Sequence, residues 1–149
     1  MATGTSFNHF PLIASRIIPA CKRVVRTTAK DIRDMATINA PRDTGWLESG
    51  MYAATDQGVQ YSGAKFTGTG YQLQSKEMFP PELPSDELEA IAGVGATYGI
   101  YVEMGTRFMP AQPYFYPAVA WANAHFMQSL DFEGLLASGV TGSIGIEAV

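Results

Sequence analysis

Few side chains in this sequence have the types and spacing that enzymatic chemistry needs. An enzyme of this size would show a nucleophile beside a base, paired acids in a cleft, or a set of metal ligands. The two histidines, His9 and His125, are far apart in the sequence, and neither sits in a catalytic or metal-binding motif. The sequence therefore predicts no catalytic residue, no metal site and no cofactor.

The single cysteine and the glycine clusters are better explained by structure than by chemistry. Cys21 has no second cysteine to pair with, and it falls on the apolar stripe of a helical pattern, where a small hydrophobe is the expected role. The stretches "GTGY" and "GVGATYG" lack the lysine and the strand-to-helix setting of a phosphate-binding loop. We interpret both stretches as turns, and we expect a reducing compartment such as the cytosol.

The composition indicates one domain whose surface is poor in charged side chains. The chain has 149 residues, of which 46% are hydrophobic and 16% charged, against a charged share of about 25% in average soluble domains. Interface cores are depleted in charged residues, so such a surface is typical of repeated subunit contacts. The apolar run 10–20 is interrupted by Pro11, Arg16 and Pro19, and it predicts neither a signal peptide nor a membrane span.

Charge is distributed unevenly along the chain. The net charge is −4, yet residues 1–45 hold seven basic and three acidic side chains, while residues 46–149 hold three basic and eleven acidic ones. The basic side chains could bind nucleic-acid phosphates, lie in solvent or contact another subunit. The acidic total and the lack of interleaved aromatic residues favour solvent or a subunit contact. The candidate subunit-interface residues are Lys22, Arg23, Arg26, Lys30, Arg33 and Arg107.

The elements that would position these residues begin with a long amphipathic helix over about 12–39. Asn39 can end it, because Pro41 disfavours helical backbone at the residue before it. Pro19 either begins the helix proper or kinks it. The predicted apolar face consists of Cys21, Val24, Val25, Thr28, Ile32 and Met35. A short helix over 44–50 follows, capped by Asp43 or Thr44.

The second half of the chain predicts short strands, a long loop and a second helix. Residues 51–66 are typical of two strands broken near Gly58. Residues 67–89 form a loop with one helical turn from Ser85, followed by a strand over 91–95 and a short helix that Gly105 ends. The last helix begins near Pro117, which would stand at its first position. Its predicted face consists of Ala118, Trp121, Ala122, His125, Phe126 and Leu130. A glycine-rich tail, 134–149, could add a strand to another sheet or remain a loose terminus.

Glu103 is a lone acid within an otherwise apolar segment. A half-buried carboxylate without partners is costly. We therefore expect Glu103 to accept hydrogen bonds from backbone N–H groups or to pair with Arg42 or Arg107. The alternative is an exposed side chain without a partner.

Two segments together resemble the signatures of a family of bacteriophage neck proteins, the head-tail joining or tail-completion (tail terminator) proteins of tailed double-stranded DNA phages. The first is "APRDTG" followed by Leu47, and the second is "YGIYVEMGTRFMPAQPYFYPA" over 98–118. The resemblance covers about residues 12–130, with Gly99 where the family usually has Ala and Tyr114 where it often has Phe. The matching residues are Ala40, Pro41, Asp43, Thr44, Gly45, Leu47, Tyr98, Tyr101, Val102, Glu103, Gly105, Thr106, Gln112, Pro113, Pro117 and Ala118.

The resemblance implies a structural virion protein that catalyses nothing. Similar proteins assemble in the host cytoplasm as rings, commonly hexameric, between the portal-bearing head and the tail. They cap the tail tube and leave a channel for genomic DNA, which passes without sequence-specific binding. The implied partners are copies of the chain, the tail tube protein and the connector proteins under the portal. With the elements above, we predict an α+β fold over 1–133, in which a small, mostly antiparallel sheet packs against a long N-terminal and a shorter C-terminal helix.

The sequence leaves two other functions open. The nearer one is an adaptor or head-closure connector protein bound below the portal, which is also a virion protein but lies at another level of the neck. The more distant one is a nucleic-acid-binding module that uses the basic side chains of the first helix. In the ring, basic helix flanks would meet acidic loops of the adjacent subunit, and the remaining acids would line the channel and repel phosphates. The loop 67–89 and the tail are candidate segments for contacts with the tail tube or the connector.

Overall fold

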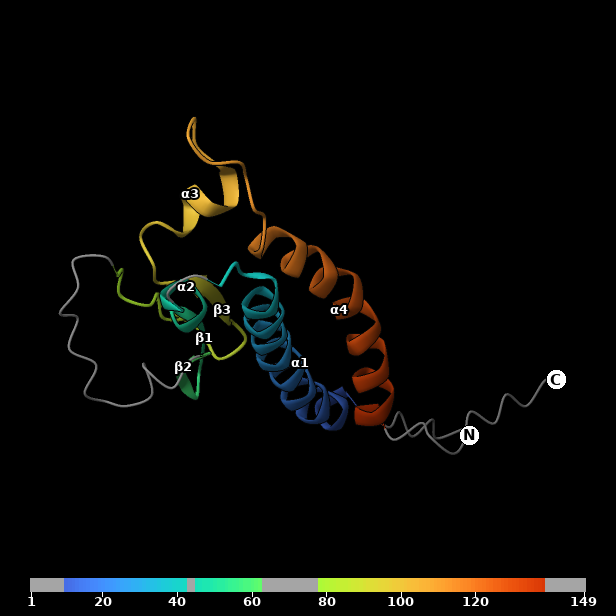
Figure 1. Cartoon of the computed structure of the whole chain (residues 1–149). Helices are drawn as coiled ribbons and strands as arrows, with labels where there is room; N and C mark the ends of the chain where they lie inside the picture. The colour runs from blue at the N-terminus through green and yellow to red at the C-terminus, as the bar shows by residue number, and fades with distance from the viewer. Residues whose placement is uncertain (1–9, 43–44, 63–77, 139–149) are drawn as a thin grey trace, which may run out of the picture.

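The computed structural model describes residues 10–42, 45–62 and 78–138, with the backbone alone over 10–14, 16 and 131–138. His9, the predicted cap residues Asp43 and Thr44, residues 67–77 of the predicted loop and residues 139–149 of the predicted tail lie outside the described residues. The elements are arranged as drawn in Figure 1. Their bounds are α1 Phe10–Asn39, α2 Trp46–Ser49, β1 Met51–Thr55, β2 Gly58–Tyr61, β3 Ile91–Val94, α3 Gly99–Met104 and α4 Phe115–Ser138.

The sheet has three antiparallel strands in the order β2-β1-β3. β1 and β2 form a hairpin in which Thr55 pairs with Gly58 across a turn at Asp56 and Gln57. Gly58 has a φ of 116°, a conformation that favours glycine. The two predicted strands are present over 51–55 and 58–61, with the break at the expected glycine, and residues 63–66 of the prediction lie outside the described residues. The long helix α1, the antiparallel sheet and the helix α4 together make the predicted α+β fold (Figure 1).

Tyr52 connects the central strand to the segment that precedes β3. Its ring centroid lies 5.9 Å from that of Tyr61, its cross-strand partner on β2. On the other side the ring lies over Gly93, where an added Cβ would stand only 2.6 Å from ring atoms. The Tyr52 hydroxyl accepts a hydrogen bond from the backbone N–H of Glu82 at 3.1 Å. A single side chain thus holds residues near Glu82 against the sheet, and Gly93 supplies the space for it.

Residues 78–90 are the described part of the predicted long loop. Met78 extends the sheet through an isolated antiparallel bridge to Ala96. The predicted helical turn from Ser85 is present as a turn rather than a helix, because Glu89 donates its N–H to the carbonyl of Asp86 at 3.2 Å and no helix is assigned there. Both the N–H and the hydroxyl of Ser85 donate to the Glu89 carboxylate at 2.7 Å, which lowers the pKa of that carboxyl.

Helix α1 runs without interruption from Phe10 to Asn39, so Pro19 lies inside it and does not begin it. The final helical hydrogen bond runs from the N–H of Ala40 to the carbonyl of Ala36 at 2.9 Å, and the helix ends where Pro41 predicts. The most buried positions of the helix are small: Ala20, Val24, Ala29 and Ala36. The predicted face included Val24 but not the three alanines. Small side chains let α4 and the sheet approach the helix axis closely.

Helix α4 begins two residues before the predicted start, so Pro117 occupies its third position. It packs along α1, as Figure 1 shows, and it continues to Ser138, beyond the predicted start of the tail at residue 134. The predicted apolar face was too wide. Ala118 and Ala122 are buried, whereas Trp121 and His125 are exposed. The rings of Trp121 and His125 stack on each other, with 4.4 Å between their centroids. Periodicity identified the correct stripe, but only packing decides how much of it is covered.

One buried cluster joins the helices to the sheet. Tyr114 and Met51 are its largest fully buried side chains, at 2% and 0% exposure. The cluster consists of Ala36, Ala40, Leu47, Met51, Met78, Ala96, Val102, Tyr114 and Ala118. Four of these residues, Ala40, Leu47, Val102 and Ala118, match the two motifs quoted above, and Tyr114 stands at a position where the chain departs from the second motif. The motifs therefore meet in the core, although they are some fifty residues apart in the chain.

Candidate interaction surface

Glu103 is the N-terminal cap of α4. Its side chain is 7% exposed, and its carboxylate accepts three backbone hydrogen bonds: Oε2 from Tyr114 and Phe115 at 2.8 and 2.9 Å, and Oε1 from Tyr116 at 3.0 Å. The negative charge also lies at the positive end of the helix macrodipole. The expectation that backbone N–H groups satisfy Glu103 is confirmed, and the alternative of an exposed, unpartnered acid is wrong.

Pro117 completes this cap. The first four N–H groups of a helix have no partner inside the helix. Here the N–H groups of Tyr114, which precedes the helix, and of Phe115 and Tyr116, its first two residues, donate to Glu103. The third helical residue, Pro117, has no N–H. Every donor of the first turn is thus accounted for. Because Glu103 lies in α3, the cap also fixes α3 relative to α4.

Tyr114 fastens the other end of α3. Its hydroxyl donates to the carbonyl of Gly99 at 3.1 Å. A Cβ at Gly99 would stand 2.6 Å from that hydroxyl. Burial, and then the nearby Glu103 charge, raise the pKa of the Tyr114 phenol above its usual value of 10.0. The two positions at which the chain departs from the resembled motif are therefore in direct contact, and the hydroxyl of one occupies the space that the other leaves free.

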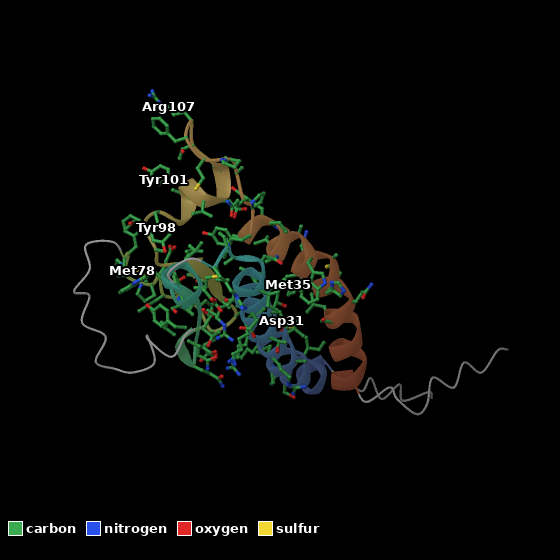
Figure 2. All side chains as sticks on the ribbon, viewed as in Figure 1. Asp31, Met35, Met78, Tyr98, Tyr101 and Arg107 are labelled. Atoms are coloured by element: carbon green, nitrogen blue, oxygen red, sulfur yellow. The ribbon has the colours of Figure 1, made fainter. Side chains whose placement is uncertain are left out.

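Residues 99–113, which we call the arm, project from the rest of the molecule. Figures 1 and 2 show α3 and the following turn pointing away from the helix pair, with Arg107 at the far end. The turn is closed by two backbone hydrogen bonds between Thr106 and Met109, at 2.8 and 3.2 Å, so that Arg107 and Phe108 form its tip. The Arg107 guanidinium lies over the Phe108 ring, 4.4 Å from its centroid.

Gly105 allows the two limbs of the arm to lie close together. Its φ of 76° and ψ of 171° belong to a region that is essentially restricted to glycine. An added Cβ would also stand 2.6 Å from the backbone nitrogen of Ala111. The N–H of Gln112 donates to the carbonyl of Val102 at 2.9 Å, which ties the returning limb to α3. The arm is thus a compact, hydrogen-bonded unit, and the prediction that Gly105 ends α3 is confirmed.

The arm carries large apolar side chains that the rest of the chain does not cover. Phe108 is 84% exposed, and Ile100, Tyr101 and Met104 are each at least 60% exposed. Helix α4 also carries large apolar side chains that are exposed: Tyr116, Val119, Trp121 and Met127. Exposed hydrophobic patches that cluster on one feature mark interaction sites more often than scattered single residues do.

An apolar groove of about 380 Å³ lies at the base of the arm. Its lining includes Phe79, Ala96, Ile100, Met104 and Tyr116. Phe79 and Tyr116 are themselves 61% and 66% exposed. This groove could not be predicted from the sequence, because its lining comes from three separate segments that only the fold brings together.

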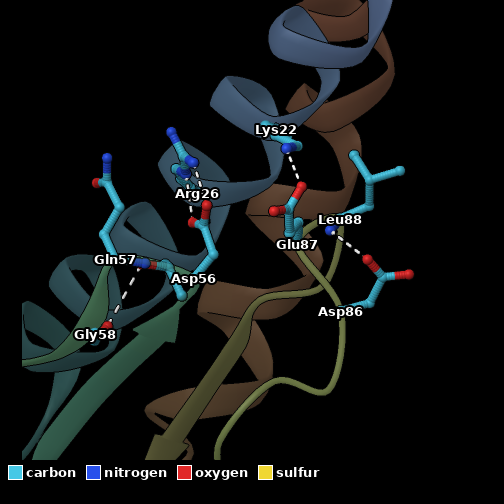
Figure 3. A network of polar contacts seen from close by, with 9 residues as sticks. Lys22, Arg26, Asp56, Gln57, Gly58, Asp86, Glu87 and Leu88 are labelled. Atoms are coloured by element: carbon cyan, nitrogen blue, oxygen red, sulfur yellow. Dashed lines mark hydrogen bonds and ion pairs between the residues drawn. The ribbon is translucent and has the colours of Figure 1, made fainter.

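Several basic side chains of α1 have acidic partners in the same chain. Figure 3 shows Lys22 paired with Glu87 and Arg26 paired with Asp56. The Arg26 Nε donates to Asp56 Oδ1 at 2.6 Å, and this hydrogen bond lowers the pKa of the Asp56 carboxyl. The charge complementarity that the sequence assigned to neighbouring subunits is thus used, at these positions, to hold α1 against the hairpin turn and residues 78–90.

The other candidate interface residues lie in different settings. Arg33 donates to Asp34 on the same helix at 2.7 Å and reaches the carbonyl of Gln60 at 3.5 Å. Lys30 is half-buried and Arg23 is exposed on α1. Arg107 is the one member of the predicted set that lies on the arm, away from α1 (Figure 2).

The first motif forms the turn between α1 and α2. Gly45 stands at the N-cap of α2 with a φ of 75° and makes no side-chain cap, so the cap position lies at Gly45 and not at Asp43 or Thr44. Arg42 approaches Glu48 at 3.7 Å, so it does not pair with Glu103. The side-chain amide of Asn39 reaches the carbonyl of Tyr114 at 3.5 Å, which links the end of α1 to the start of α4.

Chemistry-bearing side chains remain scattered in the part of the chain that the structure describes. Within it, no group of three or more His, Cys, Asp or Glu residues is placed to hold a metal ion. His125 contacts the carbonyl of Trp121 through Nδ1 at 2.8 Å on the surface of α4, and Cys21 is a half-buried free thiol. None of the described helices has both the length and the apolar character required to cross a bilayer.

Comparisons of the chain with protein-family models, with curated proteins and with solved structures yielded no match.

Proposed function

We propose that this chain is a structural protein of the phage neck, which forms a ring that completes the tail and joins it to the DNA-filled head. The observation that carries the proposal is the convergence of the resembled motifs. Glu103 from "YVEMGT" caps the helix that "YFYPA" opens, and Ala40 and Leu47 of "APRDTG" with its following Leu pack in the same core. The residues of the two motifs thus meet in one core and one helix cap.

The surface supports a protein that works by association. The arm ends in Arg107 and Phe108, and its apolar side chains lie in solvent in the single chain. Proteins that remain monomeric rarely leave so much apolar surface on a projecting feature. The rigid turn supports the same function, because docking repeatedly in one geometry is less costly when the docking element is already ordered.

The charge distribution is consistent with a channel that DNA passes through. The chain as a whole carries a net charge of −4. Lys22 and Arg26, which a nucleic-acid-binding module would turn toward phosphates, are engaged by acids of the same chain. We propose that unpaired acidic residues line the channel and repel the DNA backbone, so that DNA slides without sticking.

Deletion of the gene from the phage that encodes it tests the proposal. We expect the lysate to contain DNA-filled heads and separate tails in electron micrographs, and we expect purified wild-type particles to contain the chain. Complementation from a plasmid should restore joined virions. Joined, infectious particles that lack the chain would refute the structural role. Imaging virions that carry a labelled subunit would then give its level in the neck and separate a tail-completion ring from a connector below the portal.

A further inference from the structure

We propose that the tip of the arm, Arg107 and Phe108, inserts into the groove at the base of the arm of a second copy of this chain. The inference deepens the proposed function and rests on it, because it names the contact through which the ring would be built. The projecting element and the groove lie on the same chain, and one subunit therefore offers both halves of the contact.

The groove has room for the side chains that the arm presents. A cavity of about 150 Å³ can hold a benzene ring, and the groove measures about 380 Å³. It can therefore take the Phe108 ring together with a neighbouring side chain such as Tyr101. The lining matches this occupant, since Phe79, Ile100 and Met104 offer aromatic and aliphatic surface.

The tip of the arm cannot easily reach the groove of its own chain. The two hydrogen bonds between Thr106 and Met109 hold the tip as a closed turn, and the bond from Gln112 to Val102 holds the returning limb on α3. Figure 2 shows Arg107 at the end of the arm that lies away from the body of the chain. A tip held in this way is available to a neighbour, and its order lowers the entropic cost of docking.

The apolar side chains of the tip and of the groove supply much of the area that a specific contact needs. On the inserting side, Tyr101 and Phe108 are 60% and 84% exposed, and at about 200 Å² for an aromatic side chain they offer roughly 290 Å². On the groove side, Phe79, Ile100, Met104 and Tyr116 are 61–66% exposed, and they offer roughly 500 Å² at the same area per side chain. One partner in a standard interface contributes about 800 Å², so the rest has to come from other surface, such as the exposed apolar side chains of α4.

Charge favours the same arrangement. Among the described residues, Arg107 has no carboxylate partner, and its guanidinium lies on the Phe108 ring. Glu82 is exposed and stands three residues after the groove wall Phe79. An arginine that enters beside Phe79 would come close to this acid, which would orient the tip without a buried, unpaired charge.

The contact is head-to-tail, because the tip of one copy meets the groove of the next and leaves its own groove for a third. Such heterologous contacts generate rings when the rotation closes, whereas a two-fold contact would stop at a dimer. This difference gives a direct test that does not depend on activity.

The test uses engineered cysteines in a Cys21→Ala chain. Arg107→Cys and Thr97→Cys place one thiol at the tip and one in the lining of the groove. Treated with a short bismaleimide, a chain with both cysteines should give a ladder of covalent oligomers beyond the dimer. A mixture of two chains with one cysteine each should give dimers alone. The matched control replaces Thr97→Cys by Leu88→Cys, which should give no ladder.

Leu88 is a suitable control because it is exposed and distant from the arm. Its neighbour Glu87 pairs with Lys22, whereas Asn39, near the other end of α1, contacts Tyr114 at the base of the arm. Seventeen helical residues separate these two points of α1, which corresponds to about 25 Å at 1.5 Å per residue. Leu88 is also a large apolar residue, at 46% exposure.

Sedimentation of serine variants measures the energetic importance of the tip. We expect Phe108→Ser to raise the dissociation constant of self-association at least about tenfold, as for a central aromatic residue of an interface. Leu88→Ser should change it less than about twofold, and both variants should keep the wild-type circular dichroism.

Three outcomes would overturn the arm contact. A ladder that fails to form while the wild type sediments as an oligomer would assign self-association to another face and leave the ring proposal standing. Products that stop at the dimer in the doubly substituted chain would show a two-fold contact. Equal loss of association in Phe108→Ser and Leu88→Ser would exclude a specific role for the tip. Deletion of the gene, described above, tests the neck function separately.

Discussion

The replacement of Glu103 by glutamine tests how α4 is held. The variant keeps the size of the side chain and removes its charge. The carboxylate serves three backbone donors through two oxygens, at 2.8, 2.9 and 3.0 Å. A glutamine has a single carbonyl oxygen, which can serve Tyr114 and Phe115. Its NH2 group would then face the N–H of Tyr116, so that one buried donor loses its acceptor.

The expected cost follows from these contacts. A buried donor without an acceptor costs about 1–3 kcal/mol, and loss of a partly buried negative charge at a helix N-terminus costs up to about 2 kcal/mol. We therefore expect Glu103→Gln to lower the free energy of unfolding by about 2–4 kcal/mol. For a domain of this length, that corresponds to a fall in the melting temperature of roughly 5–15 °C. It is a large share of a typical total of about 5–15 kcal/mol.

Urea unfolding, followed by circular dichroism, measures this cost. The control is Glu87→Gln, which makes the same chemical change at an exposed position that pairs with Lys22 and should alter stability by less than about 1 kcal/mol. Hydrogen exchange adds a local readout, because the amides of Tyr114, Phe115 and Tyr116 should lose more protection than those of α1. The reasoning fails if both glutamine variants unfold at the same urea concentration with the same slope.

Three further predictions concern single contacts. Gly99→Ala and Tyr114→Phe should each destabilise the chain, by about 1–3 and 0.5–1.5 kcal/mol, but the double variant should lose less than their sum, and strict additivity would refute the contact. Asp56→Asn should destabilise the chain near neutral pH, with a difference from wild type that shrinks as the pH falls below about 4, since the pKa of Asp56 is lowered by Arg26 in the fold; a pH-independent difference would contradict the pairing. Gly105→Ala should lower the free energy of unfolding by at least about 1–3 kcal/mol, because Gly105 has a positive φ. Wild-type stability would show that the arm rearranges instead.

Much of the backbone could be predicted because the signals were local. Asn39 and Pro41 mark the end of α1, Gly58 marks the hairpin turn, and Gly105 marks the end of α3. Each of these residues restricts or permits backbone angles whatever surrounds it. The acceptor role of Glu103 could also be predicted, because a carboxylate in an apolar segment must find donors.

Features that depend on tertiary contact could not be predicted in the same way. Helical periodicity placed Trp121 and Ala122 on one stripe, but only the position of α1 determines that Ala122 is buried and Trp121 is not. The partners of Lys22 and Arg26 were sought in another subunit, because charge totals carry no geometry. The exposure of Phe108 follows from the projection of the arm, which no local signal reports.

The cap and the arm form one rigid unit, which would connect the stability of the chain to the proposed assembly. Glu103 lies in α3, at the root of the arm, and it grips the first turn of α4, which in turn packs on α1. The Tyr114 hydroxyl holds the other end of α3 through Gly99. The direction of the arm is therefore set by the helix pair. A ring closes only if every subunit repeats the same rotation relative to its neighbour. A variant that loosens the cap should therefore impair closure at temperatures where the chain is still folded, because an arm of variable direction can still dock but cannot repeat one angle around the ring.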